Sequence, residues 1–324
     1  GILGINARNL LYIKKENPQA GIAFADDKLR TKQYLSARGI KTAKILAKIS
    51  SEQELQKFRF ESLPLECVLK PNSGYGGQGI WVIKGRRGES FETTDGKILS
   101  RQEIEDHLSD ILEGRYCITG TKDKAFFEER LISHPDMGIL GRYGLPDIRI
   151  IVFNLIPIMA MLRVPTRESR GKANLNMGGL GFGIDIAKGI TTHITHHYRL
   201  LQFHPDFETL KGFKIPFWDQ ILLLSSEIQE KVTLGYLAVD IVVDKDRGPT
   251  LLEINARAGL SVQTANLAPL RERLDRISGI KVQTPEKGVR IAQDLFGKKM
   301  ERKTLQSSKK IIGLSEDLIL HLEN

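Results

Sequence analysis

The sequence predicts an α+β fold in which antiparallel sheets are combined with helices. Residues 90–100 indicate a hairpin, because two short β-type runs flank an Asp-Gly dipeptide that is typical of tight turns. Residues 125–132, 147–153 and 156–164 are β-type runs that read as consecutive strands of a largely antiparallel sheet. Because helices do not follow every strand, the pattern differs from a strict β-α-β alternation.

Each remaining element has its own local signal. Residues 26–39 show the helical spacing of apolar side chains and end at Gly39, which suits a C-cap. A second helix begins with a capping box, Ser51 to Glu54. Further helices are predicted at residues 101–112 and 217–232. Strands are predicted at residues 43–49, 65–70, 79–84, 236–244 and 249–255.

The composition is that of a soluble globular protein with a sizeable core. The chain has 324 residues, of which 41% are hydrophobic and 27% are charged. The apolar run from Ile150 to Leu162 contains Asn154 and Pro157. Because it is short and interrupted, this run predicts two buried strands, and we expect no transmembrane segment.

Charge and cysteine content restrict the expected partners and location. The formal net charge of +9 is compatible with acidic ligands. No aromatic and basic stretch resembles an RNA-reading strand and no zinc-finger spacing occurs, so we expect no nucleic-acid partner. Cys67 and Cys117 each lie in an apolar stretch, and no secretory signal precedes them. We therefore expect a cytoplasmic protein without a disulfide framework.

Residues 69–83 contain a glycine-rich segment, Gly74-x-Gly76-x-x-Gly79, that matches the dinucleotide-binding fingerprint literally. That fingerprint requires a helix after the last glycine, but here Ile-Trp-Val-Ile follows, which favours a strand. No Gly-Lys-Ser/Thr closes the segment, so a Walker loop is excluded as well. A β-hairpin with a glycine-rich tip remains, whose backbone N–H groups can converge on phosphate oxygens beside Lys70. A mobile hairpin without function is the alternative.

Two strands near residue 250 carry oxygen donors suited to a divalent cation. Glu253 and Asn255 are two residues apart on one strand, so their side chains share a face. A turn brings Asp240, on the preceding strand, beside them. Such a set can hold one or two Mg²⁺ ions that bridge a triphosphate. Solvent-facing positions on an edge hairpin are the alternative, but the apolar neighbours of these residues favour burial.

Taken in this order, the motifs between residues 26 and 259 resemble the ATP-grasp superfamily. The resemblance implies an α+β ATP-grasp fold with two α+β subdomains that clamp ATP, a shortened N-terminal region and a helical C-terminal tail. It divides the chain into an N-terminal segment, a subdomain with the glycine hairpin, a subdomain with the metal and reaction centre, and a basic tail. Their bounds are 1–25, 26–130, 131–275 and 276–324.

The resemblance also assigns roles in nucleotide binding. Lys28, in the first helix of the superfamily pattern, is implied to reach the phosphates with Lys70. The implied metal ligands are Asp240, Glu253 and Asn255, with ATP and Mg²⁺ bound together and Mn²⁺ as an alternative ion. The implied phosphate loop and adenine-binding hinge consist of Gly74, Gly76, Gly77, Gly79, Glu128, Glu129, Arg130 and Leu131.

Residues 146–186 are similar to the α-L-glutamate ligases, and residues 171–179 to a related subfamily and to ATP-grasp proteins linked to sugar transfer. This similarity implies arginine and amide donors that stabilise an acyl-phosphate and its tetrahedral adduct. Lys172 stands where related ligases often have arginine, so it keeps the charge but loses the fork geometry. The implied reaction-centre residues are Asp147, Arg149, Arg163, Lys172 and Asn174.

These assignments together predict an ATP- and Mg²⁺-dependent carboxylate–amine ligase that acts through an acyl-phosphate. Glutamate or a similar amino acid is the donor that the resemblance suggests, and small amino acids, peptides, an acceptor macromolecule or a partner protein are the expected partners. The short segment 1–25 stands in place of a larger N-terminal domain, so part of the acceptor pocket is expected to be rebuilt or supplied by a partner. A phosphotransferase and a non-catalytic ATP-binding module are the alternative functions.

Three further features have competing interpretations. His193, His196 and His197 lack a visible fourth zinc ligand, so we interpret them as a polar strand and loop. Arg257 either contacts the acyl substrate or γ-phosphate or lies in a surface turn. A basic group near the C-terminus is a solvated tail or, less favoured, a docking patch. It comprises Lys298, Lys299, Arg302, Lys303, Lys309 and Lys310.

Overall fold

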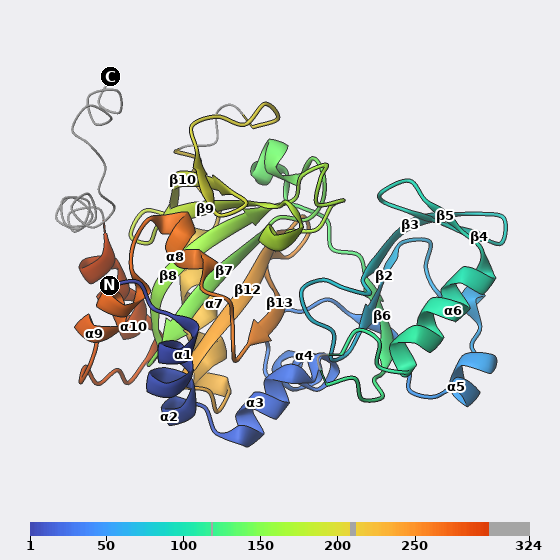
Figure 1. Cartoon of the computed structure of the whole chain (residues 1–324), viewed down its shortest axis with the longest axis horizontal. Helices are drawn as coiled ribbons and strands as arrows, with labels where there is room; N and C mark the ends of the chain where they lie inside the picture. The colour runs from blue at the N-terminus through green and yellow to red at the C-terminus, as the bar shows by residue number, and fades with distance from the viewer. Residues whose placement is uncertain (118, 208–211, 298–324) are drawn as a thin grey trace.

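The computed structural model describes residues 1–117, 119–207 and 212–297. Within these ranges the chain forms two antiparallel sheets, which lie in two lobes side by side in Figure 1. The smaller lobe carries a six-stranded sheet and the larger lobe a seven-stranded sheet. The predicted combination of hairpins and helices is therefore confirmed.

The six-stranded sheet has the order β1-β6-β2-β3-β4-β5, and every neighbouring pair is antiparallel. Helix α6 starts at a complete capping box between Ser100 and Glu103 and buries Ile104, Leu108 and Ile111 in the core of this lobe. The elements are β1 (Ile45–Ile49), α5 (Glu52–Gln56), η2 (Phe60–Ser62), β2 (Cys67–Pro71), β3 (Trp81–Arg87), β4 (Ser90–Thr93), β5 (Ile98–Leu99), α6 (Arg101–Leu112) and β6 (Ala125–Glu129).

The seven-stranded sheet has the order β11-β10-β9-β8-β7-β12-β13. Helices α7 and α10 pack together and against the sheet, and α8 packs against β8, β9 and β10. The elements are η3 (Pro135–Gly141), β7 (Asp147–Phe153), β8 (Ile156–Val164), η4 (Leu175–Met177), β9 (Leu180–Asp185), β10 (Ile190–His196), β11 (Arg199–Leu201), α7 (Trp218–Lys231), β12 (Tyr236–Asp244), β13 (Gly248–Asn255), α8 (Ser261–Asn266), α9 (Leu270–Arg276) and α10 (Pro285–Phe296).

The N-terminal segment packs on the larger lobe. Leu3, Ile13 and Leu35 belong to its hydrophobic core. The Asn17 amide donates to the carbonyls of Tyr236 and Ala256, 2.8 and 3.2 Å away, and so fastens the segment to the ends of β12 and β13. The elements are α1 (Ile5–Arg8), the π-helical η1 (Asn9–Ile13), α2 (Lys14–Glu16), α3 (Gln19–Asp26) and α4 (Lys28–Ser36).

The chain passes between the lobes twice, before β1 and after β6. At the first passage Thr42 pairs with Leu251, and at the second Ser133 pairs with Asp244. A small hydrophobic cluster of Ala43, Leu131 and Val242 lies where these passages meet β12. Backbone pairing and apolar contacts therefore join the two lobes at the base of β12 and β13.

One strand lies in a different sheet from the one the sequence predicts. Strand β6 pairs with β1 and β2 in the smaller lobe, so the expectation that residues 125–132 continue directly into the sheet of β7 and β8 is wrong. The physical reason is the segment after β6, which passes to the other lobe before β7 begins. The β-type composition of residues 125–132 predicted a strand, but it does not show which strands that strand pairs with.

The remaining observations concern the chain ends and the surface. The described part of the predicted C-terminal tail contains α10, and the basic group from Lys298 onward lies outside the described residues. Among the described helices, none combines the length and apolar character that a membrane crossing needs. Cys67 and Cys117 are both free thiols.

Candidate active site

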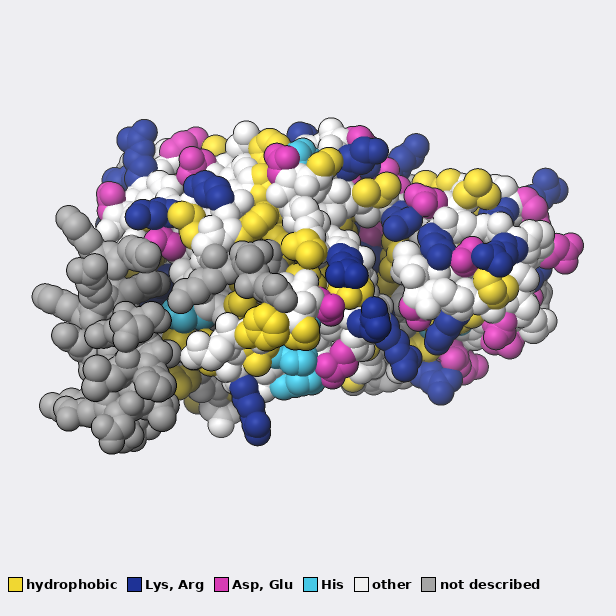
Figure 2. Space-filling model, turned by 90° about the horizontal axis from the view of Figure 1, so that it is seen from above, with side chains coloured by type: hydrophobic (Ala, Val, Ile, Leu, Met, Phe, Trp, Pro, Cys, Tyr) yellow, Lys and Arg dark blue, Asp and Glu magenta, His cyan; other side chains and the backbone are white. Residues whose placement is uncertain are grey.

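A cleft of about 1750 Å³ is lined by side chains from both lobes. Its lining includes the turn between β2 and β3, the end of β6 and the last residues of β13. Figure 2, which views the molecule from above, shows lysine and arginine side chains gathered where the two lobes meet. The cleft therefore brings together the regions in which the sequence placed phosphate, adenine and metal ligands.

The glycine loop (residues 74–79) is the tip of the β2–β3 hairpin, whose register pairs Leu69 with Trp81. Gly76, Gly77 and Gly79 have φ of 61°, 74° and 70°, a left-handed conformation that favours glycine. The hairpin predicted in place of a dinucleotide-binding turn is thus confirmed. The backbone conformation at Gly76, Gly77 and Gly79 is therefore itself a reason for glycine at these positions.

One side of the glycine loop rests on a histidine. His107 Nε2 lies 2.9 Å from the Gly79 carbonyl, and its ring stacks on Trp81 at a centroid distance of 3.8 Å. Burial lowers the pKa of His107, so the ring is neutral near pH 7 and can donate to that carbonyl. A side chain at Gly79 would strike the Tyr116 ring, with contacts of 2.8 Å. This end of the loop is therefore closely packed.

The other side of the glycine loop contacts the larger lobe. Asn174 Nδ2 donates to the Gly76 carbonyl at 2.5 Å, and Lys172 Nζ donates to the Gly77 carbonyl at 2.9 Å. Lys28 Nζ donates to the Gly74 carbonyl at 2.5 Å. All three donor side chains line the cleft. Their predicted roles toward phosphate and acyl groups stay predictions, and in this structure they hold the loop across the cleft.

Lys32, Lys70 and Glu128 form a buried group that we call the lysine cluster. Lys32 Nζ lies 3.0 Å from one carboxylate oxygen of Glu128, and Lys70 Nζ contacts the other. Burial lowers the pKa of Lys32. The pKa of Glu128 is also lowered, because the two lysines outweigh the opposing effect of its burial. Two ammonium groups against one carboxylate give the lysine cluster a formal charge of +1.

Lys32 is a site residue that the sequence interpretation missed. It lies four residues after Lys28 on α4, so the two lysines share a helix face. A second lysine one helical turn after Lys28 is the sequence signal that could have identified it. Its partner Glu128 follows far later in the chain, and the pair becomes visible only when α4 and β6 are placed together.

The other residues of the predicted adenine hinge also line the cleft. The Glu129 carboxylate accepts from Arg247 and from the backbone N–H of Lys44, both at 2.5 Å, and so joins the two lobes. Arg130 pairs with Glu66 at 2.9 Å, and Leu131 is buried between the lobes. The structure brings the hinge to the cleft, and its contact with adenine stays a prediction.

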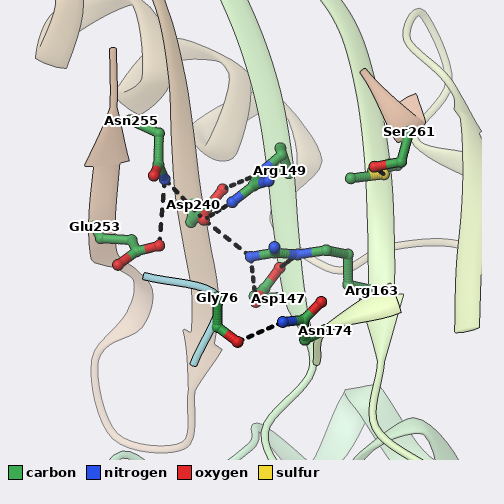
Figure 3. A network of polar contacts seen from close by, with 10 residues as sticks. Gly76, Asp147, Arg149, Arg163, Asn174, Asp240, Glu253, Asn255 and Ser261 are labelled. Atoms are coloured by element: carbon green, nitrogen blue, oxygen red, sulfur yellow. Dashed lines mark hydrogen bonds and ion pairs between the residues drawn. The ribbon is translucent and has the colours of Figure 1, made fainter. Parts of the chain in front are cut away.

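Asp147, Arg149, Arg163 and Asp240 form a second buried group, shown in Figure 3, which we call the arginine–carboxylate cluster. Arg149 donates to both oxygens of Asp240, at 2.8 and 2.6 Å. Arg163 donates to both oxygens of Asp147, at 2.5 and 2.7 Å, and also to Asp240 at 2.9 Å. The antiparallel register, in which Arg163 opposes Asp147 and Arg149 opposes Asp240, places these pairs side by side.

The two aspartates of this cluster differ in proton affinity. Burial raises the pKa of Asp147 to about 6, with the neighbouring Asp240 adding to the effect and Arg163 opposing it. The pKa of Asp240 is lowered to about 2, because Arg149 and Arg163 together outweigh its burial. The difference follows from partner number: Asp240 accepts from two guanidinium groups and Asp147 from one. Asp147 is therefore the first of the pair to take up a proton.

The three predicted metal ligands are close together, but they are not equivalent. Asn255 Nδ2 lies 3.3 Å from Asp240 Oδ2 and 3.2 Å from Glu253 Oε1. Glu253 and Asn255 line the cleft, whereas Asp240 is fully buried beneath the arginines. Counting Glu253 with the cluster gives two guanidinium groups against three carboxylates, a formal charge of −1. Oxygen donors with net negative charge fit a hard divalent cation.

Two other features from the sequence are also placed. Arg257 forms a half-exposed ion pair with Asp26 at 2.5 Å at the edge of the cleft, so both of its predicted interpretations stay open. His196 and His197 lie beside Glu168, which comes from a different segment.

The chain was compared with family models, with curated proteins and with solved structures. The model of the sugar-transfer associated ATP-grasp family matches residues 7–279. No curated protein matched the chain. Among solved structures, D-alanine–D-alanine ligase from Bacillus anthracis complexed with ATP is similar, with 14% identity, a TM-score of 0.43, and coverage of 84% of this chain and 67% of that one.

The ATP-grasp ligase PsnB complexed with a minimal precursor is also similar, with 15% identity and a TM-score of 0.39. The match covers 81% of this chain but only 64% of PsnB, less than two thirds of that protein's length. The family match extends over most of the chain and both lobes, and it agrees with the predicted fold class. This chain therefore belongs to the sugar-transfer associated ATP-grasp family.

Proposed function

We propose that this chain is an ATP- and Mg²⁺-dependent carboxylate–amine ligase. The observation that carries the proposal is that one cleft is lined both by the lysine cluster, which carries a formal positive charge, and by the arginine–carboxylate cluster, which is negative once Glu253 is counted with it. A nucleoside triphosphate with its metal presents anionic phosphates together with a cation, so it complements both clusters at once. Membership of an ATP-grasp family supports the same conclusion.

The lysine cluster and the glycine loop would hold the phosphates. Lys70 is 12% exposed while Lys32 is 4% exposed, so Lys70 is the cation that faces the cleft and Lys32 keeps Glu128 from neutralising it. Because Gly76, Gly77 and Gly79 have left-handed conformations and no side chains, the backbone N–H groups at the loop tip could approach phosphate oxygens without obstruction. Lys28, which lines the cleft and donates to the Gly74 carbonyl, would reach the phosphates together with Lys70, and the hinge from Glu128 to Leu131 would contact adenine.

The opposite wall would hold the metal. Glu253 and Asn255 would contribute oxygen ligands, and buried Asp240 would fix Arg149 and Arg163 in place. When bound, Mg²⁺ supplies positive charge against the phosphate oxygens. Mn²⁺ is an alternative, because it accepts the same oxygen ligands.

In the proposed reaction a substrate carboxylate oxygen attacks the γ-phosphorus, and the bond from that phosphorus to the ADP oxygen breaks. The amine nitrogen of the second substrate then attacks the acyl carbon, loses a proton, and displaces phosphate as the amide forms. Arg149 and Arg163 reach the cleft with 11% and 12% of their side chains exposed, so they can face the negative acyl-phosphate. Lys172 and Asn174, which line the same cleft and contact the glycine loop, would add donors for the acyl-phosphate.

Glutamate or a similar amino acid, joined to a peptide or to a larger acceptor, is the substrate pair we propose. The similarity of residues 146–186 to α-L-glutamate ligases supports this choice. The two free cysteines agree with a cytoplasmic location.

A product assay tests the proposal. ADP release would be measured with a library of amino acids and peptides, and products would be identified by mass spectrometry. The ligase predicts one amide formed for each ADP, and Glu253→Ala abolishes that coupling. A phosphorylated product without an amide would favour a phosphotransferase. Absence of turnover with every pair would favour a non-catalytic ATP-binding module.

A further inference from the structure

Three metal-binding side chains meet at a place separate from the lysine and arginine–carboxylate clusters. Glu168 lies between β8 and β9, His196 ends β10, and His197 is in the turn before β11. His197 Nε2 lies 2.9 Å from Glu168 Oε1, and His196 Nε2 lies 3.2 Å from Glu168 Oε2. The three ligand atoms lie within 4.8 Å of one another. The structure thus supplies the carboxylate that sequence spacing does not reveal.

The separations match what one small metal ion requires. In a tetrahedral zinc site, nitrogen and oxygen ligands lie about 2.0–2.1 Å from the ion, so any two of them are about 3.4 Å apart. The two nitrogen–oxygen distances here are slightly shorter than that value. Two imidazoles and one carboxylate form a ligand set that zinc uses with a fourth position open. Imidazole ligands favour zinc and neighbouring transition metals over Mg²⁺.

The backbone next to Glu168, His196 and His197 has two unusual features. His197 and Tyr198 have φ of 46° and 62°, a left-handed conformation at both central positions of a tight hairpin, where asparagine and glycine are usual. The Tyr198 hydroxyl donates to the Asn176 side chain and holds the turn against the neighbouring segment. A Cβ at Gly178 would lie 2.6–2.8 Å from the Glu168 side chain, so glycine leaves room for the carboxylate.

We propose that Glu168, His196 and His197 bind a divalent transition-metal ion, with zinc as the ion of choice and a fourth position filled by water. The ion would replace the proton that His196 Nε2 shares with the Gly178 carbonyl, 3.1 Å away. It would join the segment between β8 and β9 to the β10–β11 turn. That segment also carries Lys172 and Asn174, so the site stabilises the part of the larger lobe that holds the glycine loop.

Zinc titration of tag-free protein in excess Mg²⁺ tests the site. Calorimetry should show one Zn²⁺ per chain, with affinity reduced at least 10–100-fold in Glu168→Gln and binding abolished in the Glu168→Gln/His197→Ala double variant. Co²⁺ should give the absorption of a four-coordinate ion in the wild type and not in the double variant. His134→Ala is the matched control, because His134 also lies beside a carboxylate, Asp136, and should leave binding unchanged.

A structural readout separates loss of the ligand set from misfolding. Zn²⁺ should slow amide hydrogen exchange in residues 166–179 of the wild type, while the metal-free double variant keeps the wild-type circular dichroism. The proposal is overturned if the wild type binds no Zn²⁺ in excess Mg²⁺. It is equally overturned if the double variant binds as tightly as the wild type, and the three side chains are then only an ion pair.

Discussion

The lysine cluster and the arginine–carboxylate cluster balance their buried charges in different ways. In the lysine cluster, one carboxylate stands between two ammonium groups, and a positive charge is left over at the cleft. In the arginine–carboxylate cluster, paired guanidinium forks satisfy both aspartates, and Glu253 leaves the surplus negative. Because burying an unpaired charge is costly, each surplus must face a ligand or water. The comparison supports the proposal that Lys70 faces the phosphates of the bound nucleotide and that Glu253 faces its metal ion.

The largest expected effect comes from removing the centre of the arginine–carboxylate cluster. Asp240→Ala leaves two buried guanidinium groups without their shared acceptor, so the free energy of unfolding should fall by about 3–5 kcal/mol. Glu128→Ala should cost less, because Lys70 can turn toward the cleft and Lys32, whose pKa burial already lowers, can release its proton, whereas the guanidinium groups keep their charge. Urea unfolding measures both, with exposed Asp294→Ala as the control. An equal loss in the two variants would contradict the described difference between the clusters.

The pH dependence of the free energy of unfolding tests the difference between the two aspartates of the arginine–carboxylate cluster. The pKa of Asp147 is raised to about 6 in the folded protein, so between about pH 4 and pH 6 the folded state binds more protons than the unfolded state. This group therefore makes stability fall as pH rises through that window. Asp147→Asn should remove that fall, as measured by urea unfolding at steps from pH 4.5 to 7.

Asp240 contributes in the opposite direction at lower pH. Its pKa is lowered to about 2, so its stabilising effect is present above pH 4 and is lost as pH falls toward 2.

If the wild type and Asp147→Asn had parallel stability profiles from pH 4.5 to 7, Asp147 would not be the member of the pair that takes up the proton.

The smallest expected effect concerns the contact between the lobes at the glycine loop. Lys172→Ala removes the donor to the Gly77 carbonyl, which is worth about 1 kcal/mol. Amide exchange in residues 74–79 should then be roughly fivefold faster, as followed by mass spectrometry. Lys57→Ala, at the far end of α5, is the control. Unchanged exchange in Lys172→Ala would show that the loop is held without this lysine.

Local signals predicted much of the site. The Ile-Trp-Val-Ile run after Gly79 identified a hairpin, because strand character is readable over a few residues. The period of two on β13 placed Glu253 and Asn255 on one face. The sequence could not show that Asp240 lies beneath Arg149 and Arg163, because that depends on the order of strands in the sheet.

The missed residues share a physical reason. Lys32 matters through its contact with Glu128, and Glu168 through its contact with His196 and His197. In each case the partner belongs to a segment far away along the chain. Periodicity and spacing describe one segment at a time. They can therefore identify each side chain separately, but they cannot show that two side chains from distant segments are in contact.

ATP binding measured with and without Mg²⁺ tests the division between the lobes most directly. Titration calorimetry would compare the wild type with Lys70→Ala and Glu253→Gln. If the lysine cluster holds phosphates, Lys70→Ala weakens ATP binding about 10–100-fold under both conditions, the loss expected for a hydrogen bond to a charged group. If Glu253 holds the metal, Glu253→Gln weakens binding only when Mg²⁺ is present. Equal weakening by Glu253→Gln without Mg²⁺, or unchanged affinity in Lys70→Ala, would contradict the account.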